Sequence, residues 1–198
     1  MTAVLRPVLA CTSALLLLCS GVYPAAVTGL ARVIFPWQSS GSLLVEGGRV
    51  RGSALLGQTF ADPAAHPEYF WGRPSAASVD TATGLTVSGG SNLGSSSPSL
   101  LEAVESREAA LRATGGLAGA VPADLSHASG SGLDPHVSIE GARAQVGRVA
   151  RVRGVPRAQL EAMVARFTEP PTLAVLGEPG VNVLRLNLAL DALRPGAP

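Results

Sequence analysis

Hydrophobic residues are concentrated near the start of the chain, where no charged residue occurs between Pro7 and Ala31. This uncharged run is 25 residues long, and a helix needs about 20 apolar residues to cross a bilayer. A cleaved signal peptide has a shorter apolar core, about 7–15 residues, followed by an A-x-A-like site, and "YPAAVTGLA" offers no clean site of that kind. The pattern therefore predicts a retained transmembrane helix at about residues 7–31, within an N-terminal segment 1–36.

Four residues inside this run affect its interpretation. A lipoprotein signal would have to use Cys11, which leaves too short a leader, or Cys19, which follows four leucines instead of a small residue. Gly21 and Pro24 both weaken a lone helix, but beside other membrane helices glycine permits close approach and proline is tolerated. The run is therefore predicted to contact partner helices. Counting the arginines on either side does not decide its orientation.

Residues 37–198 alternate between strand-like and helix-like patterns, which predicts one soluble α+β domain of ordinary size. A hairpin is expected where two β-prone runs, residues 43–45 and 49–56, flank Glu46-Gly47-Gly48. Residues 61–99 are rich in Gly, Ser and Pro, and loops of this length are usually functional or disordered.

Three helices and a final strand are predicted after this loop. The first begins either at Pro98 after a Ser97 cap or with a Ser99–Glu102 capping box, and it ends at Gly115-Gly116. Its expected buried stripe is Leu100, Leu101, Val104 and Leu111. The second helix is predicted over residues 139–153, between a Ser138 cap and Gly154, and its expected buried face is Ile139, Ala142, Val146, Val149 and Ala150. The third helix is predicted over residues 156–167, and its expected buried face is Leu160, Met163, Val164 and Phe167. The final element is a half-buried strand at residues 181–190, with Leu184, Leu186, Leu188 and Leu190 on one face.

The amino-acid composition excludes several classes of function. All 15 basic residues are arginine, so the chain has no lysine for a P-loop, a kinase site or a Schiff base. Both cysteines lie in the apolar run, so the soluble part has neither a disulfide nor a thiol nucleophile. A net charge of +1 does not suggest a polyanion-binding domain.

Positive charge is nevertheless concentrated in the two consecutive helices at residues 139–167. Six arginines against two glutamates give this stretch a charge of +4. Such a helix pair could meet DNA phosphates, acidic lipid headgroups or an acidic protein. Because a membrane helix tethers the chain, we expect lipid or protein partners and no nucleic acid.

Histidine and serine provide the candidates for catalysis. His66, His127 and His136 lack the close spacing of a zinc site. The loop from Ser126 to His136 holds Ser, Asp and His residues, which keeps open an alternative function as a membrane-anchored periplasmic hydrolase or binding module. It lacks the G-x-S-x-G elbow of serine hydrolases. A local role for Asp134, in a turn before Pro135, explains its position more simply.

Two other stretches are candidate contact surfaces. In "YFWGRPSA", Tyr69, Phe70, Trp71 and Arg73 are of the residue types that dominate protein interfaces, although the rings could equally pack into the core. The glycine-rich "SGGSNLGSSS", which contains Gly90 and Asn92, has neither phosphate-binding fingerprint. It is predicted to be a flexible or partner-contacting loop.

The ordered set of motifs resembles the C subunit of the Kdp-type potassium-transporting ATPase of bacteria. The resemblance runs along nearly the whole chain, through "GVYP", "FPWQSSGSLL", "VRGSALLGQTF", "YFWGRPSA", "SGGSNLG", "SHASGSGLDPHVS", "AQVGRVARVRG" and "GVNVLRLNLALD". Two departures are visible: "SHASGSGLDP" stands where the family commonly has "TASASGLDP", and "ADPAAHPE" precedes the aromatic motif.

The resemblance implies an accessory subunit that is not itself an enzyme. In that family it joins a potassium-channel-like subunit, a P-type ATPase subunit that hydrolyses ATP and a small membrane subunit. It crosses the inner membrane once, with its amino terminus in the cytoplasm and its domain in the periplasm. It is needed for assembly and is described as raising the ATP affinity of the ATPase subunit. No tightly bound cofactor is implied, since ATP and potassium act through the complex.

The same resemblance implies roles for individual residues. If the effect on ATP involves this chain directly, Gln145 is the residue to test. The partner interface is expected at Gly21 and Pro24 in the anchor, and in the soluble domain at Tyr69, Phe70, Trp71, Arg73, Gly90, Asn92 and Asp134. As a hypothesis, the aromatic and glycine-rich loops dock over the mouth of the channel-like subunit.

Overall fold

The computed structural model describes residues 2–58, 66–114, 117 and 119–193. The chain forms two compact units, Met1–Arg51 and Gly52–Pro198. An apolar helix begins the first unit and a mixture of helices and strands forms the rest of the chain, so the predicted α+β class is confirmed. The predicted domain boundary after residue 36 stays a prediction.

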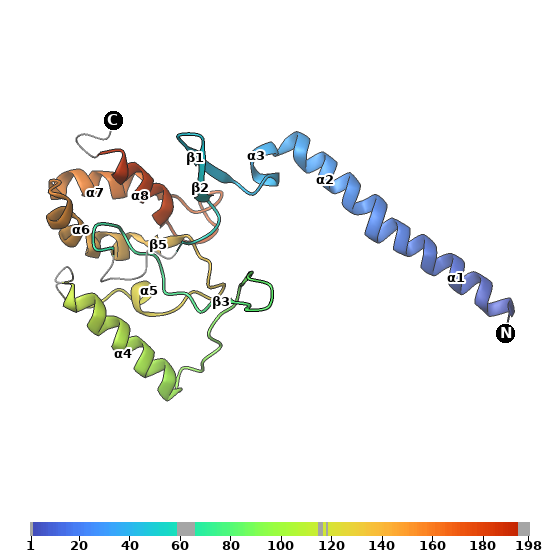
Figure 1. Cartoon of the computed structure of the whole chain (residues 1–198), viewed down its shortest axis with the longest axis horizontal. Helices are drawn as coiled ribbons and strands as arrows, with labels where there is room; N and C mark the ends of the chain where they lie inside the picture. The colour runs from blue at the N-terminus through green and yellow to red at the C-terminus, as the bar shows by residue number, and fades with distance from the viewer. Residues whose placement is uncertain (1, 59–65, 115–116, 118, 194–198) are drawn as a thin grey trace. The chain divides into compact units, whose positions relative to one another are not determined.

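A long apolar helix dominates the first unit. It consists of α1 (Thr2–Leu17), a π-helical turn η1 (Leu18–Val22) and α2 (Tyr23–Ile34), drawn in Figure 1 as one continuous rod. Its 31-residue stretch Val4–Ile34 has a mean hydropathy of 1.8 and buries none of its most apolar window within the chain. By length and composition this helix can cross a membrane.

A short helix and most of the predicted hairpin complete the first unit, and the second strand of the hairpin continues into the second unit. After α3 (Pro36–Ser39), strands β1 (Leu43–Glu46) and β2 (Arg49–Ser53) pair with each other. Gly47 and Gly48 connect them with φ angles of 57° and 76°. Both angles are positive, as the tightest hairpin turns require, which is why glycine occupies both places.

The second unit contains two small sheets and five helices among its described residues. Strands β3 (Ser78–Val79) and β4 (Thr86–Val87) form a two-stranded ribbon. The antiparallel sheet β5–β7–β6 is formed by His136–Ser138, Gly180–Asn182 and Thr168–Glu169, with Val137 opposite Val181. The helices are α4 (Pro98–Ala113), α5 (Ala123–Ser126), α6 (Ile139–Arg153), α7 (Arg157–Arg166) and α8 (Val183–Asp191) (Figure 1).

The helix predictions for α6 and α7 are confirmed, and that for α4 is confirmed in part. The Ser138 hydroxyl accepts the Gly141 N–H at 2.8 Å, and Gly154 ends α6 with φ 67°. α4 begins at Pro98, with Ser97 in the N-cap position but without a side-chain cap bond. Leu101 was predicted to be buried but is exposed. The predicted stop at residues 115–116 lies outside the described residues.

The prediction of a strand over residues 181–190 is wrong beyond Asn182. The Asn182 carboxamide accepts the Arg185 N–H at 3.1 Å and thereby caps α8. Leucine is a strong helix former, unlike the β-branched residues that favour strands. The buried positions Val183, Leu186, Asn187 and Leu190 have the i, i+3, i+4, i+7 spacing of a helix face. The alternation of leucines was therefore a misleading signal.

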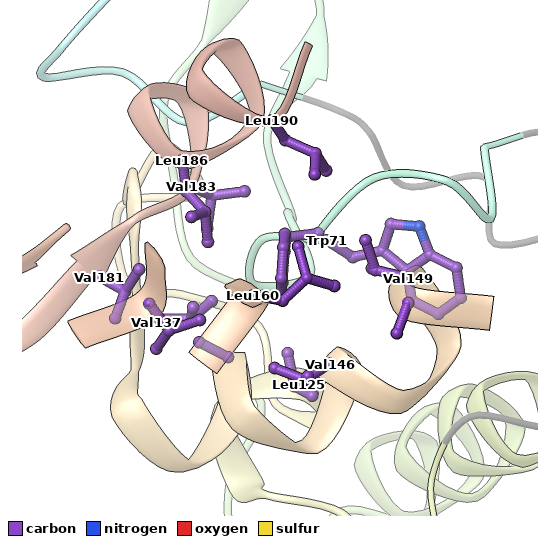
Figure 2. Packing of buried hydrophobic residues seen from close by; sticks show 14 of the residues in the cluster. Trp71, Leu125, Val137, Val146, Val149, Leu160, Val181, Val183, Leu186 and Leu190 are labelled. Atoms are coloured by element: carbon purple, nitrogen blue, oxygen red, sulfur yellow. The ribbon is translucent and has the colours of Figure 1, made fainter. Parts of the chain in front are cut away.

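The core of the second unit lies between α6, α7, α8 and the three-stranded sheet. Figure 2 shows part of this cluster, with Val149 of α6, Leu160 of α7 and Leu186 of α8. Phe70 and Trp71, which belong to no helix or strand, are also buried in it. The aromatic motif therefore packs in the core, and this burial raises the question of how its backbone groups are satisfied.

Candidate functional site

Two side-chain amides satisfy the buried backbone of the aromatic motif. The Asn187 amide of α8 accepts the Phe70 N–H at 2.9 Å and donates to the Phe70 carbonyl at 2.8 Å. The Gln145 amide of α6 accepts the Trp71 N–H at 2.8 Å and donates to the Trp71 carbonyl at 3.1 Å. The two amides thus supply the hydrogen bonds that a neighbouring strand would otherwise provide, which a buried peptide requires.

Gln145, proposed above as a nucleotide-related residue, has all its amide positions engaged within the chain. Besides the two bonds to Trp71, its oxygen accepts from the Arg148 guanidinium at 2.8 Å and its nitrogen donates to the Gly141 carbonyl at 3.2 Å. The side chain is buried. The role that follows from this geometry is positioning of Trp71, and the nucleotide role stays a prediction.

A third buried side chain, Arg148, binds the aromatic motif together with Gln145 and Asn187, and these three residues are called the cradle below. Its guanidinium lies 3.4 Å from the centre of the Trp71 ring and donates to the carbonyls of Pro67 and Tyr69. Burial lowers the pKa of Arg148 to about 10, so the side chain remains charged at neutral pH. Arginine suits this place because its planar fork stacks on a ring while donating in several directions.

Sequence reasoning missed Arg148 and Asn187, although a signal for each was present. Asn187 lies four residues after Val183 and three before Leu190, and Arg148 lies three residues after Gln145, so both occupy positions on a buried helix face. A polar side chain at such a position must have a buried partner. The uninterrupted "YFW" run, which lacks the alternation of a strand, is the segment in need of that partner.

Tyr69 lies at the edge of the cradle. Its hydroxyl donates to the Asp191 carboxylate at 2.9 Å, and the same carboxylate accepts from Arg153 at 2.9 Å. The Arg153 guanidinium also lies 4.6 Å from the centre of the Tyr69 ring. Burial, followed by the neighbouring Asp191, raises the pKa of the Tyr69 phenol above its usual value of 10, and the charge on Arg153 opposes this shift.

We expect Tyr69 to titrate at a pH above 10 in the folded chain. The Tyr23→Phe variant leaves Tyr69 as its only tyrosine, so absorbance at 295 nm follows this group alone. The unfolded phenol loses its proton first as the pH rises, so the stability contributed by Tyr69 is complete below pH 10 and is lost through the folded pKa. Titration in denaturant should give the ordinary value. A folded midpoint at or below that value would contradict the prediction.

A second cluster brings together three of the motifs identified in the sequence. Arg73 donates to the Asp134 carboxylate at 3.1 Å, and the other oxygen of Asp134 accepts the His136 N–H at 2.9 Å. The Ser75 hydroxyl donates to the Gly132 carbonyl at 2.6 Å. The stretch that follows the aromatic motif is thus joined to the "SGLDP" loop.

The glycine-rich stretch joins the same cluster by close backbone contact. A Cβ added to Gly90 would lie 2.8 Å from the Gly130 carbonyl oxygen, and one added to Gly132 would lie 2.7 Å from that of Gly89. Only glycine permits this approach. Asn92 adopts φ 52° and is exposed. A pocket of about 490 Å³ borders the cluster, with Arg73, Asp134 and Leu184 among its lining residues.

Of the predicted partner contacts in the soluble domain, two are buried. Phe70 and Trp71 present no ring to a partner in this state. Tyr69, Arg73 and Asp134 are half-buried, and Asn92 is exposed. The partner interface itself stays a prediction. Of the residues predicted to form it, those in the cluster around Arg73 and Asp134 are the ones that a partner could reach.

The loop from Ser126 to His136 shows no catalytic arrangement in the part of the chain that is described. The Ser126 hydroxyl is 3.0 Å from Nδ1 of its neighbour His127, which also contacts the Ala123 carbonyl. His136 contacts the Glu169 carboxylate at 3.0 Å instead of a serine. The Ser129 hydroxyl is buried without a hydrogen-bond partner.

The basic helix pair presents less positive charge than its sequence suggests. Arg148 is buried under Trp71, and Arg153 is mostly buried against Asp191. Arg143, Arg151 and Arg157 line an open depression of about 980 Å³, which Glu140 and several small apolar residues share. The expectation of lipid or protein partners instead of nucleic acid stays a prediction.

The comparisons with known proteins cover nearly the whole chain. The family model described as "K+-transporting ATPase, c chain" matches residues 5–192. A potassium-transporting ATPase KdpC subunit from Polaromonas naphthalenivorans (strain CJ2) is 52% identical over 196 residues, which are 98% of this chain and 97% of the relative. The subunit of the same name from Sorangium cellulosum (strain So ce56) is 53% identical over 195 residues, 98% of this chain and 100% of the relative. The chain therefore belongs to the C-chain family of the K+-transporting ATPases.

Proposed function

We propose that this chain is a non-catalytic subunit of an ATP-driven potassium uptake complex in the bacterial inner membrane. It holds together a channel-like subunit, a P-type ATPase subunit that carries out catalysis, and a small membrane subunit. Its amino terminus lies in the cytoplasm and its soluble domain on the periplasmic or extracellular side, as the resemblance implies. Its single helix also contacts membrane lipid.

The observation that carries this proposal is the long apolar helix, which the chain itself leaves uncovered, in a subunit of a transport ATPase. Such a helix both tethers the domain and offers a surface to other membrane helices. The polar residues best placed for chemistry in the domain, Gln145, Arg148 and Asn187, bond to the protein's own backbone. Both facts support assembly as the role of this chain.

The family description of raised ATP affinity belongs to the same proposal. The chain has no lysine, and the Gln145 amide is occupied by Trp71. Both facts favour an indirect effect, in which the assembled chain changes the conformation of the ATPase subunit. An effect through assembly also suits a domain on the opposite side of the membrane from ATP.

The test is reconstitution of the complex with and without this chain. We expect the channel-like and ATPase subunits to co-purify, and to show potassium-stimulated ATP hydrolysis, only when the full chain is present. As a control, residues 1–36 are replaced by an unrelated single membrane span, which should restore the tether but not full assembly. Full assembly and activity in the absence of the chain would disprove the role.

The same preparations distinguish the assembly role from the alternative function as a hydrolase. If the chain were an enzyme, ester or peptide hydrolysis would appear with the purified chain alone and would fall on replacement of Ser129 or His136. Under our proposal neither replacement changes a hydrolytic activity, because the isolated chain has none to change.

A further inference from the structure

The connection between β6 and β7 presents consecutive apolar side chains to solvent. Every residue from 172 to 179 is exposed. Leu173 is 82% exposed, Val175 78% and Leu176 59%, and the first two are the most exposed large hydrophobic residues in the described part of the second unit. Single exposed apolar residues are ordinary on a protein surface, whereas a contiguous group of them marks a contact site. Residues 172–176 are called the apolar turn below.

The backbone of the apolar turn is strained. The Val175 N–H donates to the Thr172 carbonyl at 3.3 Å, and the two residues between them, Leu173 and Ala174, have φ angles of 55° and 63°. Tight hairpin turns with two positive φ angles favour Asn-Gly, because a Cβ is costly in this conformation. Leu173 gains no packing in return, since its side chain is exposed. Strained residues of this kind are concentrated at functional surfaces.

The fold holds this turn in one conformation. Thr172 and Leu176 exchange two backbone hydrogen bonds of 2.9 Å each. At the base of the connection, the Glu169 carboxylate accepts from Arg185 of α8 at 2.8 Å. Residues 170–179 also include three prolines, which restrict the backbone. A loop that is ordered before binding loses little entropy when a partner covers it.

Charge selects a protein as the occupant of this surface. Residues 168–180 include Glu169 and Glu178 but no basic and no aromatic residue. Segments that enter a membrane surface use basic and aromatic side chains, and acidic lipid headgroups would repel this one. Arg185 neutralises Glu169, whereas Glu178 is exposed and has no ion-pair partner within the part of the chain that the structure describes. The complementary surface is an apolar pocket with a basic rim.

We propose that the apolar turn inserts Leu173 and Val175 into such a pocket on the extracytoplasmic face of a membrane subunit of the complex. Glu178 pairs with an arginine or lysine at the rim of the pocket. This inference rests on the proposed function, because it needs a partner subunit on that side of the membrane. It assigns a contact to a segment that lies outside the aromatic and glycine-rich motifs.

The direct test is photo-cross-linking in the purified complex. The photo-reactive amino acid p-benzoylphenylalanine replaces Val175 in the full chain, and in a control chain it replaces Leu101, which is exposed on α4. We expect position 175 to cross-link to a membrane subunit and position 101 to give no such product. A cross-link from position 175 only to lipid, or only to a second copy of this chain, would overturn the proposal.

A second test separates the contact from folding by giving the two opposite signs. The double change Leu173→Asn and Ala174→Gly keeps the turn, relieves its strain and removes its largest apolar side chain. We expect the midpoint of unfolding in urea to rise. The rate at which the chain leaves the complex in detergent should nevertheless increase about ten- to hundredfold, the range for a buried leucine side chain. Leu101→Gln is the control and should leave the complex at the unmodified rate.

The charge of the partner is tested at Glu178. Glu178→Arg should also speed dissociation from the complex, because it brings like charges together at the rim. If the turn instead bound acidic lipid, the same change would strengthen attachment. Glu105→Arg, at an exposed position of α4, makes the same change of charge outside the turn. Equal rates for the two variants would overturn the choice of a basic partner.

The outcomes distinguish this inference from the proposed function. If the unmodified chain does not assemble with the other subunits, the proposed function fails. If it assembles, but position 175 does not cross-link to a membrane subunit or the turn variant dissociates no faster than Leu101→Gln, only the docking surface is overturned. Should the turn variant fail to fold, the cross-link alone decides.

Discussion

Replacing Trp71 with alanine is expected to destabilise the second unit by about 3–5 kcal/mol, the range for removing a large buried aromatic side chain. The ring is buried in the core cluster and covers the Arg148 guanidinium at 3.4 Å. Its removal leaves a cavity and exposes a buried charge to it. Pulse proteolysis of the full chain in detergent over a urea series measures the change, since proteolysis samples the unfolded population without relying on tryptophan fluorescence.

The chain contains a matched control, because Trp37 is its only other tryptophan. Trp37 is exposed, and its indole N–H donates to the Leu43 carbonyl at 3.0 Å. Trp37→Ala should therefore cost only about 0.5–1.5 kcal/mol. Equal costs for the two variants would contradict the burial of Trp71.

Because Trp71 is part of the core, its replacement cannot be used to test whether the aromatic motif contacts a partner subunit. A Trp71 variant that fails to join the complex would report an unfolded domain and not a lost contact. The docking hypothesis is better examined at Arg73 and Asp134, which form a half-buried ion pair at 3.1 Å outside the core cluster.

The Gln145→Leu change is expected to cost about 2–6 kcal/mol. It keeps the size of the side chain but leaves both backbone groups of Trp71 unpaired, at about 1–3 kcal/mol each. The exposed Gln159 of α7 offers the control, and Gln159→Leu should stay within about 0.5 kcal/mol of the unmodified chain. The same urea series measures both.

The Gln145 variant also separates a positioning role from a nucleotide role. If Gln145 acts through Trp71, the chain loses stability, and any complex that still assembles keeps its KM for ATP. If Gln145 contacts nucleotide, KM rises while stability is unchanged. The second result would show that the hydrogen bonds to Trp71 matter little and that the side chain leaves them in the complex.

The helices around Ser138, Gly154 and Pro156 were predictable because caps and periodicity are local signals. The end of the chain was not, because the leucine alternation of residues 184–190 imitates a strand while a single capping residue, Asn182, decides for a helix. The cradle around Trp71 was beyond sequence reasoning for another reason. Trp71 bonds to Gln145 and Phe70 bonds to Asn187, which are 74 and 117 residues away along the chain. Contacts between residues so far apart in the sequence are formed by tertiary packing and leave no local signal.

The same distances determine when the domain can fold. Phe70 and Asn187 are separated by 117 residues, so during synthesis the aromatic motif emerges long before the helix that satisfies its backbone. Contacts of such long range are slow to form, because the intervening chain must first be ordered. The aromatic motif therefore lacks the side-chain amide that satisfies Phe70 until α8 has been synthesised, so α8 completes the core of the second unit.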